Sequence, residues 1–536
     1  MEKKFKLNFK LYYSAITKTI LNNKHLYFNP KFHFAPNQNW INDPNGLFFL
    51  DGVYHLYFQY YPKDVVWGPM HWGHATSKDL IFWEEHPIAL SPDEKGYIFS
   101  GSVVVDKNNT SGFCTKDSTA IIAIFTYHDA IAESKGQKTH QTQGLAYSLD
   151  GGYTFTKYSD NPIIENPGIK DFRDPKVIWN QTQKNWLMLL STYNETLFYI
   201  SNNLKDWKYQ SSFGMDVGAH GGVWECPDMF PLQIENSQEN MQETKWVLLQ
   251  SLNPGGPNGG SGTQYFIGDF DGKTFRVDDD FSKEIEGNAD SKAKWLDYGK
   301  DNYASVSWSN IPENDGRRLI IGWMSNWDYA DKIPTKGFRG KMTLPRKLSL
   351  LKTNGSYKLI SKPVQELNLY ASKIIELNDI PLGGKFEVNI NDHRLNNSIL
   401  KIELNTTTKS IYTIRLFNDL GEHLDFGIDT IKDLYFIDRS NSGLVSFSKK
   451  FVNPVSRAPI NEHSKSLDLT AIIDDGSIEL FFNGGITVIT EIFFNTEPFS
   501  KISVHNNSDT VSKIKLLEIH TINKGNNEHR NDIRAV

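Results

Sequence analysis

Two aspartates of this chain stand directly before a proline, where a carboxylate can be held firmly enough for nucleophilic or acid–base chemistry. Asp43 precedes the turn sequence Pro-Asn-Gly, and Asp174 precedes Pro175. A residue before proline is driven into an extended conformation, so we expect each carboxylate at a strand end where the chain turns. Aspartate before proline also opens ordinary turns, and for either motif alone the turn is the better explanation.

A third acid, Glu225, lies between Trp224 and Cys226 and before Pro227. If it is buried there or close to other carboxylates, its protonated form is favoured, as a general acid requires. The equal alternative is a glutamate at a sheet edge with its carboxylate in water.

Several tryptophans occur in segments rich in Gly, Pro or Asn, namely Trp40, Trp67, Trp72, Trp224 and Trp327. Indoles beside carboxylates can hold the apolar faces of sugars. They can equally form the core of a large β-domain, and the two explanations do not exclude each other.

The composition excludes several classes of function. The 57 basic and 63 acidic residues give a net charge of −6, which argues against a general binder of nucleic acid or membrane surfaces. Two cysteines cannot form a disulfide framework or a thiolate metal site. His71 and His74 lack the HExxH pattern, and no complete phosphate loop is present. We therefore expect no metal and no cofactor.

The N-terminus resembles a secretory signal only in its basic start. The apolar stretch that should follow ends at Lys18, without a small-residue cleavage site. We expect an N-terminal extension over residues 1–28 and favour a cytoplasmic protein, with secretion as the alternative. No uncharged apolar run approaches the roughly 18 residues of a membrane-spanning helix.

The elements that must position these acids are short strands. From residue 33 to residue 351, runs rich in β-branched and aromatic residues alternate with turns, without a strong helical period. The predicted strands include Val53–Tyr60, Ile98–Val105, Ala120–Tyr127, Trp186–Ser191, Lys245–Gln250 and Arg318–Trp323. The pattern predicts an all-β fold.

A weak repeat sharpens this prediction. A turn followed by an aromatic residue begins at Ser77, Ser148, Ser201 and Gly268. The period near 60 residues, by subtraction, fits one four-stranded propeller blade with its loops, and the region then holds about five blades. A sandwich or barrel with coincidental hairpins stays possible on the pattern alone.

Beyond Pro345 the pattern changes, and alternating strands return from Gly384 onward. We expect a five-bladed β-propeller over residues 29–359, a linker over 360–375, a C-terminal β-sandwich over 376–522 and a polar tail over 523–536.

Eight motifs in order resemble the signatures of glycoside hydrolase family 32, the invertase, inulinase and levanase type. They are Asn42–Gly46, Trp67–His74, Phe99–Ser102, Phe172–Pro175, Trp224–Pro227, Asp297–Ala304, Gly322–Trp327 and Leu344–Arg346. Members of this family have a five-bladed propeller and an appended sandwich. Two positions depart from the usual pattern: Ile41 stands where Met or Leu is usual, and Asn302 where Phe is common.

The resemblance implies Asp43 as nucleophile, Glu225 as acid/base and Asp174 as the residue that holds fructose hydroxyls and steadies the transition state. It further implies a fructose site that is lined by Asn42, Gln59, Trp67, Phe99, Ser100, Arg173 and Trp327. The implied reaction is the release of terminal β-fructofuranosyl groups from sucrose or fructans with retained configuration.

Two alternatives and two open points accompany this expectation. An inverting five-bladed hydrolase of arabinan type shares the three-acid plan but not the motifs. A non-catalytic fructan-binding protein would lack one of the acids. Preference among sucrose, inulin, levan and short oligosaccharides is not readable from the sequence, and self-association through the sandwich is possible.

Overall fold

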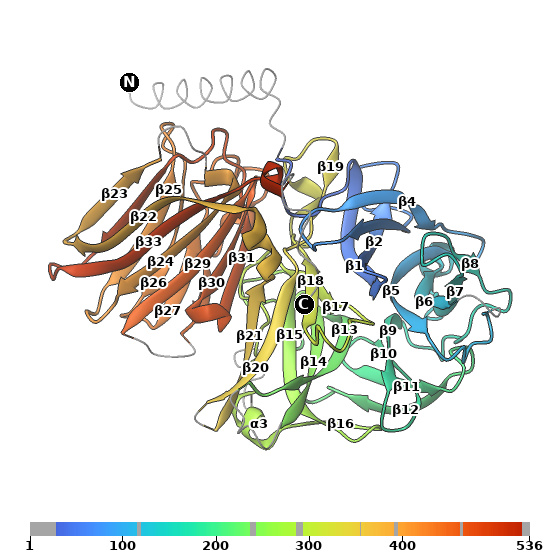
Figure 1. The fold of residues 1–536 in the computed structure, drawn as a ribbon. Coiled ribbons are helices and arrows are strands. Elements are labelled where there is room, and N and C mark those ends of the chain that lie inside the picture. Colours follow the sequence, from blue (N-terminus) through green and yellow to red (C-terminus); the bar gives the residue numbers. More distant parts are fainter. Residues whose placement is uncertain are drawn as a thin grey trace.

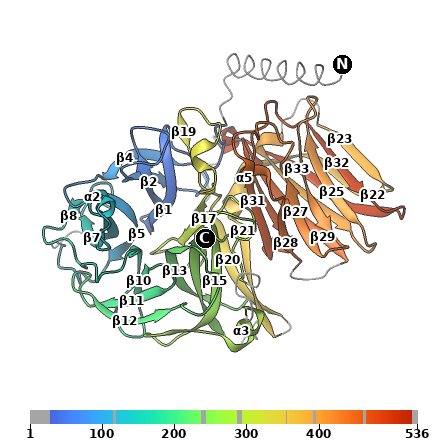
Figure 2. The same cartoon turned by 180° about the vertical axis from the view of Figure 1, so that it is seen from behind.

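The computed structural model describes residues 28–114, 119–235, 243–285, 293–353, 355–390, 395–460 and 465–527. It consists of two β-domains that lie side by side, seen in Figure 1 and from behind in Figure 2. The expected propeller and sandwich are confirmed. The expected N-terminal extension lies outside the described residues, except for Phe28. In the described part of the chain, no helix is long and apolar enough to cross a membrane.

Five sheets form the propeller. The first has the order β19-β1-β2-β3-β4, and the others follow the order β5-β6-β7-β8, β9-β10-β11-β12, β13-β14-β15-β16 and β17-β18-β20-β21 from the inside outward. The bounds of the first two sheets are β1 (Asn39–Leu50), β2 (Val53–Tyr61), β3 (His71–Ser77), β4 (Glu84–Leu90), β19 (Phe338–Arg339), β5 (Tyr97–Asp106), β6 (Ala120–His128), β7 (Gln141–Ser148) and β8 (Thr156–Lys157). Those of the next two are β9 (Arg173–Asn180), β10 (Asn185–Ser191), β11 (Thr196–Ser201), β12 (Lys208–Phe213), β13 (Val223–Gln233), β14 (Thr244–Asn253), β15 (Gly262–Phe270) and β16 (Phe275–Val277). The fifth has β17 (Tyr303–Ser307), β18 (Arg318–Trp323), β20 (Arg346–Thr353) and β21 (Ser356–Pro363).

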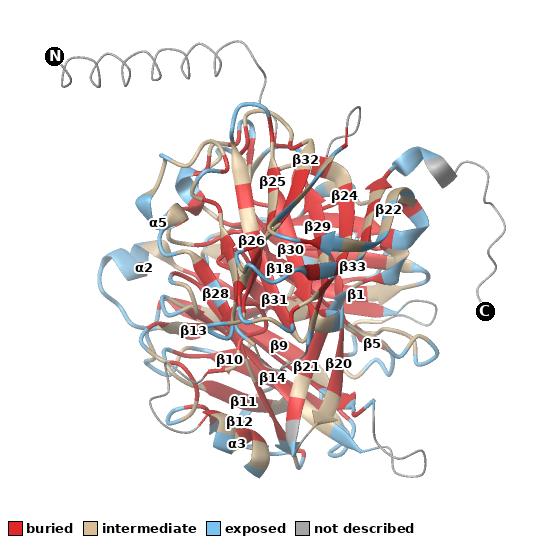
Figure 3. Cartoon of the chain, turned by 90° about the vertical axis from the view of Figure 1, so that its left-hand side faces the viewer, coloured by how far each residue is buried: buried red, intermediate tan, exposed pale blue. Residues whose placement is uncertain are grey.

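The second strand of each blade shows why these residues form a sheet. All nine residues of β6, Ala-Ile-Ile-Ala-Ile-Phe-Thr-Tyr-His, are buried, because neighbouring blades cover both faces of the sheet. Figure 3 shows buried residues along the strands of both domains. The four turn–aromatic units of the sequence all follow the third strand of a blade, after β3, β7, β11 and β15.

The innermost strands close a ring. β1 contacts β5, β5 contacts β9, β9 contacts β13, β13 contacts β17, and β17 returns to β1. The late strand β19 pairs in parallel with β1, which joins the two ends of the propeller sequence. Each of the five innermost strands also has a register irregularity near its beginning. Such bulges turn side chains away from the regular alternation of a strand.

The second domain is a sandwich of two six-stranded antiparallel sheets. One has the order β22-β33-β24-β29-β30-β31 and the other β23-β32-β25-β26-β27-β28. Their bounds are β22 (Ala371–Leu382), β33 (Ser512–Ile522), β24 (Ser398–Asn405), β29 (Ser466–Asp474), β30 (Ser477–Phe482), β31 (Thr487–Ile492), β23 (Lys385–Asn389), β32 (Lys501–Asn506), β25 (Ile411–Phe417), β26 (His423–Asp429), β27 (Leu434–Asp438) and β28 (Ser456–Pro459).

Little chain separates the two domains. β21 ends at Pro363, the 3-10 helix η2 spans Gln365–Tyr370, and β22 begins at Ala371. Residues 360–375, which the sequence suggested as a linker, thus contain the end of one sheet and the start of another. At the other end, the short 3-10 helix η5 (Lys524–Asn527) lies in the expected polar tail, whose last residues are outside the described part.

A buried group of charges ties the domains together. We call it the Arg346 cluster: Arg346, Asp297 and His33 from the propeller side, and Asp474 and Glu479 from the sandwich. Arg346 donates to Asp297 at 2.8 Å and to Glu479 at 2.6 and 2.9 Å. His33 bridges Asp474 and Glu479, each at 2.8 Å.

Candidate active site

A cavity of about 250 Å³ opens where the beginnings of the innermost strands meet. The ten residues that the sequence suggested for the site all line it: Asn42, Asp43, Gln59, Trp67, Phe99, Ser100, Arg173, Asp174, Glu225 and Trp327. They come from β1, β2, β5, β9 and β13 and from two loops. Asp43 and Glu225 are therefore brought together by ring closure, although 182 residues separate them by subtraction.

Asp43 sits in the bulge of β1 between Ile41 and Pro44. Its Oδ2 accepts a hydrogen bond from Ser100 Oγ at 2.7 Å and one from Cys226 Sγ at 3.5 Å. Its Oδ1 is buried and has no hydrogen-bond partner among the described residues. Burial, and then the charge of Glu225, raise the pKa of Asp43 above its ordinary value. One oxygen of this carboxylate is thus left free.

Asp174 is held in a strained backbone. Its φ of +62° lies in the left-handed region, and so does that of Cys226 at +47°. The Asp174 N–H donates to Thr126 Oγ1 at 3.0 Å, and the Cys226 N–H donates to Asp174 Oδ2 at 2.9 Å. Burial raises the pKa of Asp174 to about 7, and Glu225 and Asp43 add to the shift against the opposing charge of Arg173. The two strained residues fix each other.

Glu225 forms an ion pair with Arg173, whereas Arg173 acts on Asp174 only through its charge. Its Oε1 accepts from Arg173 Nε at 3.2 Å and from Nη2 at 2.9 Å, and its Oε2 accepts from the Tyr303 hydroxyl. The sequence suggested only the apolar neighbours Trp224 and Cys226. The structure adds Arg173 and Tyr303 as polar partners of Glu225, and the acids whose pKa is raised by burial are Asp43 and Asp174.

Arg173 is itself oriented from the far side. Its Nη1 donates to Asp171 Oδ1 at 2.8 Å and to Gln141 Oε1 at 3.3 Å. The same Gln141 oxygen accepts from the Phe172 N–H at 2.8 Å. This fixes the guanidinium fork in the plane in which it meets Glu225.

Aromatic side chains form the wall of the cavity. Trp67 is 43% exposed and meets Phe99 edge to face, with ring centroids 6.1 Å apart. Phe99 stacks on His128 at 4.2 Å. Trp327, which also lines the cavity, stacks on Trp40 at 5.9 Å, and Trp40 donates to Asn42 Oδ1 at 2.8 Å. Aromatic side chains beside carboxylates in one cavity suit a polyol ring with one apolar face.

Comparison with known proteins decides the family. Models of the glycosyl hydrolases family 32 N-terminal domain and of the family 32 C-terminal domain match residues 33–363 and 381–521. The chain belongs to glycosyl hydrolase family 32.

Individual relatives of family 32 cover nearly the whole chain. A levanase of Bacillus subtilis is 41% identical over 509 residues, which are 93% of this chain and 71% of that protein. An extracellular exo-inulinase of Aspergillus niger is 38% identical over 494 residues, 87% of this chain and 89% of that protein. The crystal structure of exo-inulinase from Aspergillus awamori superposes with a TM-score of 0.84 at 34% identity, covering 94% and 99% of the two chains. A Schwanniomyces occidentalis fructofuranosidase complexed with fructosylnystose has a TM-score of 0.81 at 33% identity, covering 93% and 98%.

The two departures from the family 32 pattern are not part of the lining of the cavity. Ile41 is fully buried in the core. Asn302 is buried as well, where it donates to Asp297 at 3.2 Å and accepts from Ser305. Neither lines the cavity.

Sequence reasoning missed several residues at or around the cavity. Asp171, Gln141, His128, Glu133 and His140 line it without belonging to a motif that suggested a role. Burial lowers the pKa of His128 to about 4, so its imidazole is neutral near pH 7. His128 and His140 both approach Glu133, at 3.2 and 3.8 Å.

The sequence could have indicated Tyr303 as a residue of the site. It lies in the recognised motif Asp297–Ala304, and only its partner Glu225 was not evident. In the described part of the chain, no group of three or more His, Cys, Asp or Glu side chains is placed to hold a metal ion.

Proposed function

We propose that the chain is a retaining β-fructofuranosidase that releases terminal fructosyl groups from sucrose or fructans. Asp43 is the nucleophile, Glu225 the acid/base, and Asp174 holds the fructose hydroxyls. Membership of family 32 and the names of the relatives, which include levanase, exo-inulinase and invertase, support this assignment.

The observation that carries the proposal is the unequal treatment of the two oxygens of Asp43. Oδ2 is held by Ser100 and Cys226, while the buried Oδ1 has no partner among the described residues. A buried carboxylate oxygen without a hydrogen bond costs free energy, about 1–3 kcal/mol or more for a charged group. That cost is repaid when the oxygen bonds to an electron-poor carbon.

The first step forms a covalent intermediate. Asp43 Oδ1 attacks the anomeric carbon, the bond from that carbon to the leaving oxygen breaks, and Glu225 gives its proton to that oxygen. The positive charge that develops on the sugar ring is stabilised by the carboxylates of Asp43 and Asp174. Tyr303 and Arg173 hold Glu225 at the leaving-group side.

The second step reverses the roles. Glu225, now a carboxylate, takes a proton from water, the water oxygen attacks the anomeric carbon, and the ester bond to Asp43 breaks. Two inversions give net retention, and fructose leaves with its configuration unchanged.

The relatives also support a proposal about where the protein acts. Several exo-inulinase relatives are named extracellular, which favours secretion of this chain over the cytoplasmic location that the sequence suggested. The cytoplasmic expectation has no support from these relatives.

The product formed in methanol tests the proposal. Hydrolysis of sucrose in mixed methanol and water should give methyl β-fructofuranoside beside fructose, identified by NMR. The α-anomer would indicate the inverting mechanism of the arabinan-type alternative. A folded protein that releases neither product would be the fructan-binding alternative.

A further inference from the structure

A second cavity lies at the other end of the same innermost strands. It measures about 480 Å³, larger than the candidate active site. On β5, Ser100 lines the candidate active site and Val105 lines the second cavity. On β9, Asp174 lines the candidate active site and Trp179 lines the second cavity. Between the two cavities, the ion pair of Lys176 and Asp228 joins β9 to β13 at 2.9 Å. The second cavity is therefore separate from the catalytic one.

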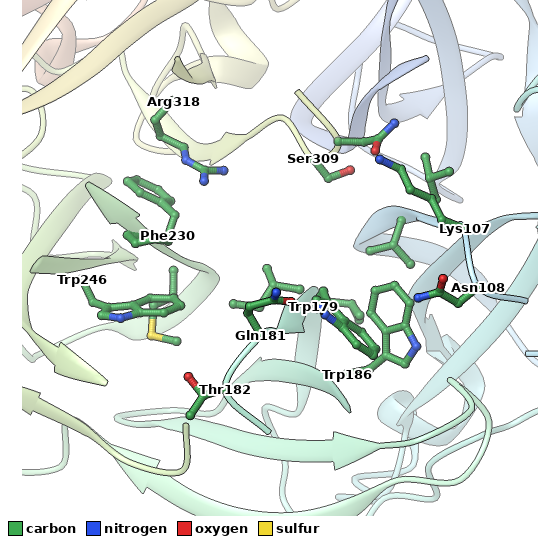
Figure 4. Close-up of a pocket in the computed structure, with 17 residues that line it drawn as sticks. Lys107, Asn108, Trp179, Gln181, Thr182, Trp186, Phe230, Trp246, Ser309 and Arg318 are labelled. Carbon is green, nitrogen blue, oxygen red and sulfur yellow. Dashed lines mark hydrogen bonds between the residues drawn. The ribbon is translucent and has the colours of Figure 1, made fainter. Parts of the chain in front are cut away.

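Four aromatic rings belong to its lining. Trp179 and Trp186 meet edge to face with centroids 5.0 Å apart, and Trp246 and Phe230 lie across from them (Figure 4). Valine, isoleucine, methionine and proline side chains complete the apolar part. Both tryptophans of the first pair already use their indole N–H groups, Trp179 on Gln181 and Trp186 on Thr110. They offer ring carbon to a ligand rather than hydrogen bonds.

Arg318 is the exceptional group of this lining. Its guanidinium packs over the Phe230 ring at 4.8 Å, and Figure 4 shows it beside that ring at the cavity. Its Nε is buried without a hydrogen-bond partner among the described residues. The nearest acid that influences it, Asp228, is already paired with Lys176. Burial lowers the pKa of Arg318, because surroundings with little water disfavour the charged form of the guanidinium.

The charged residues that line the second cavity are all positive. Lys107 and Arg318 line the cavity, and none of its lining residues is an aspartate or glutamate. A guanidinium without an ion pair in an apolar surrounding favours a carboxylate, which accepts two parallel hydrogen bonds from it. A fructosyl group is a poorer match, because it carries no negative charge to pair with Arg318.

We propose that this cavity is a binding site for a small carboxylate with an aromatic body. The carboxylate pairs with Arg318, and the aromatic body packs among Trp179, Trp186 and Trp246. The site is independent of the proposed hydrolysis, since it shares no lining residue with the candidate active site.

Calorimetric titration with naphthoate and its neutral twin naphthamide tests this site. Wild-type protein should bind naphthoate at least about tenfold more tightly than naphthamide, because only naphthoate neutralises Arg318. Saturating fructose, which competes for the active site alone, should leave the naphthoate affinity unchanged. This comparison needs no variant and stays decisive if a variant fails to fold.

Arg318→Met should weaken naphthoate binding about tenfold or more and leave naphthamide binding unchanged, since the methionine still covers Phe230. The matched control Arg276→Met removes an exposed arginine of β16 and should bind naphthoate like the wild type. Unchanged kcat on sucrose shows that both variants are folded. The proposal is overturned if naphthamide binds as tightly as naphthoate, if fructose displaces naphthoate, or if folded Arg318→Met retains wild-type affinity.

Discussion

The candidate active site and the Arg346 cluster both bury several carboxylates but treat them in opposite ways. In the Arg346 cluster, Glu479 Oε1 accepts from His33 and the Leu344 N–H, and Oε2 accepts two bonds from Arg346. Burial alone would raise the pKa of Glu479, but Arg346 and His33 outweigh it and hold the pKa at about 2. In the active site, burial raises the pKa of Asp174 to about 7.

The difference lies in the number of cations and donors around each acid. The active site has Arg173 for three acids and leaves Asp43 Oδ1 free, whereas the Arg346 cluster surrounds its acids with an arginine, a histidine and backbone N–H groups. A buried acid whose charge is balanced stabilises the fold. One that is kept short of partners is available for chemistry at a cost in stability.

The largest effect is expected for Asp43→Asn. Because the amide is no nucleophile, kcat on sucrose should fall by about four orders of magnitude or more, without loss of stability. Initial rates at saturating sucrose and a urea melt measure both quantities. The matched control is Asp297→Asn in the Arg346 cluster, which should lose stability while its folded fraction keeps near wild-type kcat. A folded Asp43→Asn protein that keeps more than a tenth of the activity would remove Asp43 from the mechanism.

The next largest effect is expected when the arginine of the Arg346 cluster is removed. Arg346→Met leaves Asp297 and Glu479 buried without their cation, so the free energy of unfolding should fall by about 3–5 kcal/mol. Urea denaturation measures it. The control Arg415→Met breaks the more exposed pair with Asp425 and should cost less than about 1 kcal/mol. Equal losses in the two variants would show that the Arg346 cluster is no more than a surface ion pair.

Asp174→Asn should increase the stability of the protein, in contrast to Arg346→Met. With a pKa of about 7 in the folded protein and 3.8 as the ordinary value, Asp174 binds its proton more tightly when folded. Its contribution therefore lowers stability as the pH rises through this window, and the full cost is present above pH 7. The variant should be more stable than wild type by about 1–3 kcal/mol at pH 8 and by little at pH 4. Thermal melts at both pH values measure this, and a variant less stable at pH 8 would refute it.

A smaller, pH-dependent loss is expected for His33→Gln. Although burial lowers the pKa of His33, hydrogen bonds to Asp474 and Glu479 outweigh it and raise the pKa above 6.5. This stabilisation is complete below pH 6.5 and is lost as the pH rises through the folded pKa. The variant should lose about 1–2 kcal/mol near pH 5.5 and less near pH 9, as measured by urea melts. A loss that grows with pH would contradict the ion-pair assignment.

The sequence predicted the fold and the composition of the cavity well, because both depend on local patterns. Strand periodicity and the turn–aromatic repeat indicated the blades, and the family resemblance named ten residues that line one cavity. The sequence could not predict which side chains these residues contact in the folded protein. Asp297 and Arg346 stand in recognised motifs like the three proposed catalytic acids, yet they contact Thr490 and Glu479 of the second domain. Pairings across more than a hundred residues follow from domain packing, which no local pattern encodes.

The most direct test is to trap the ester on Asp43. In Glu225→Ala, an aryl fructoside should still react, since its phenolate leaves without an acid, while the second step lacks its base. The intermediate should accumulate, and mass spectrometry of the protein should show the added mass of one fructosyl group. Peptide mapping should place that group on Asp43, and added azide should release it. An ester on Asp174, or turnover of the aryl fructoside without any covalent intermediate, would contradict the account.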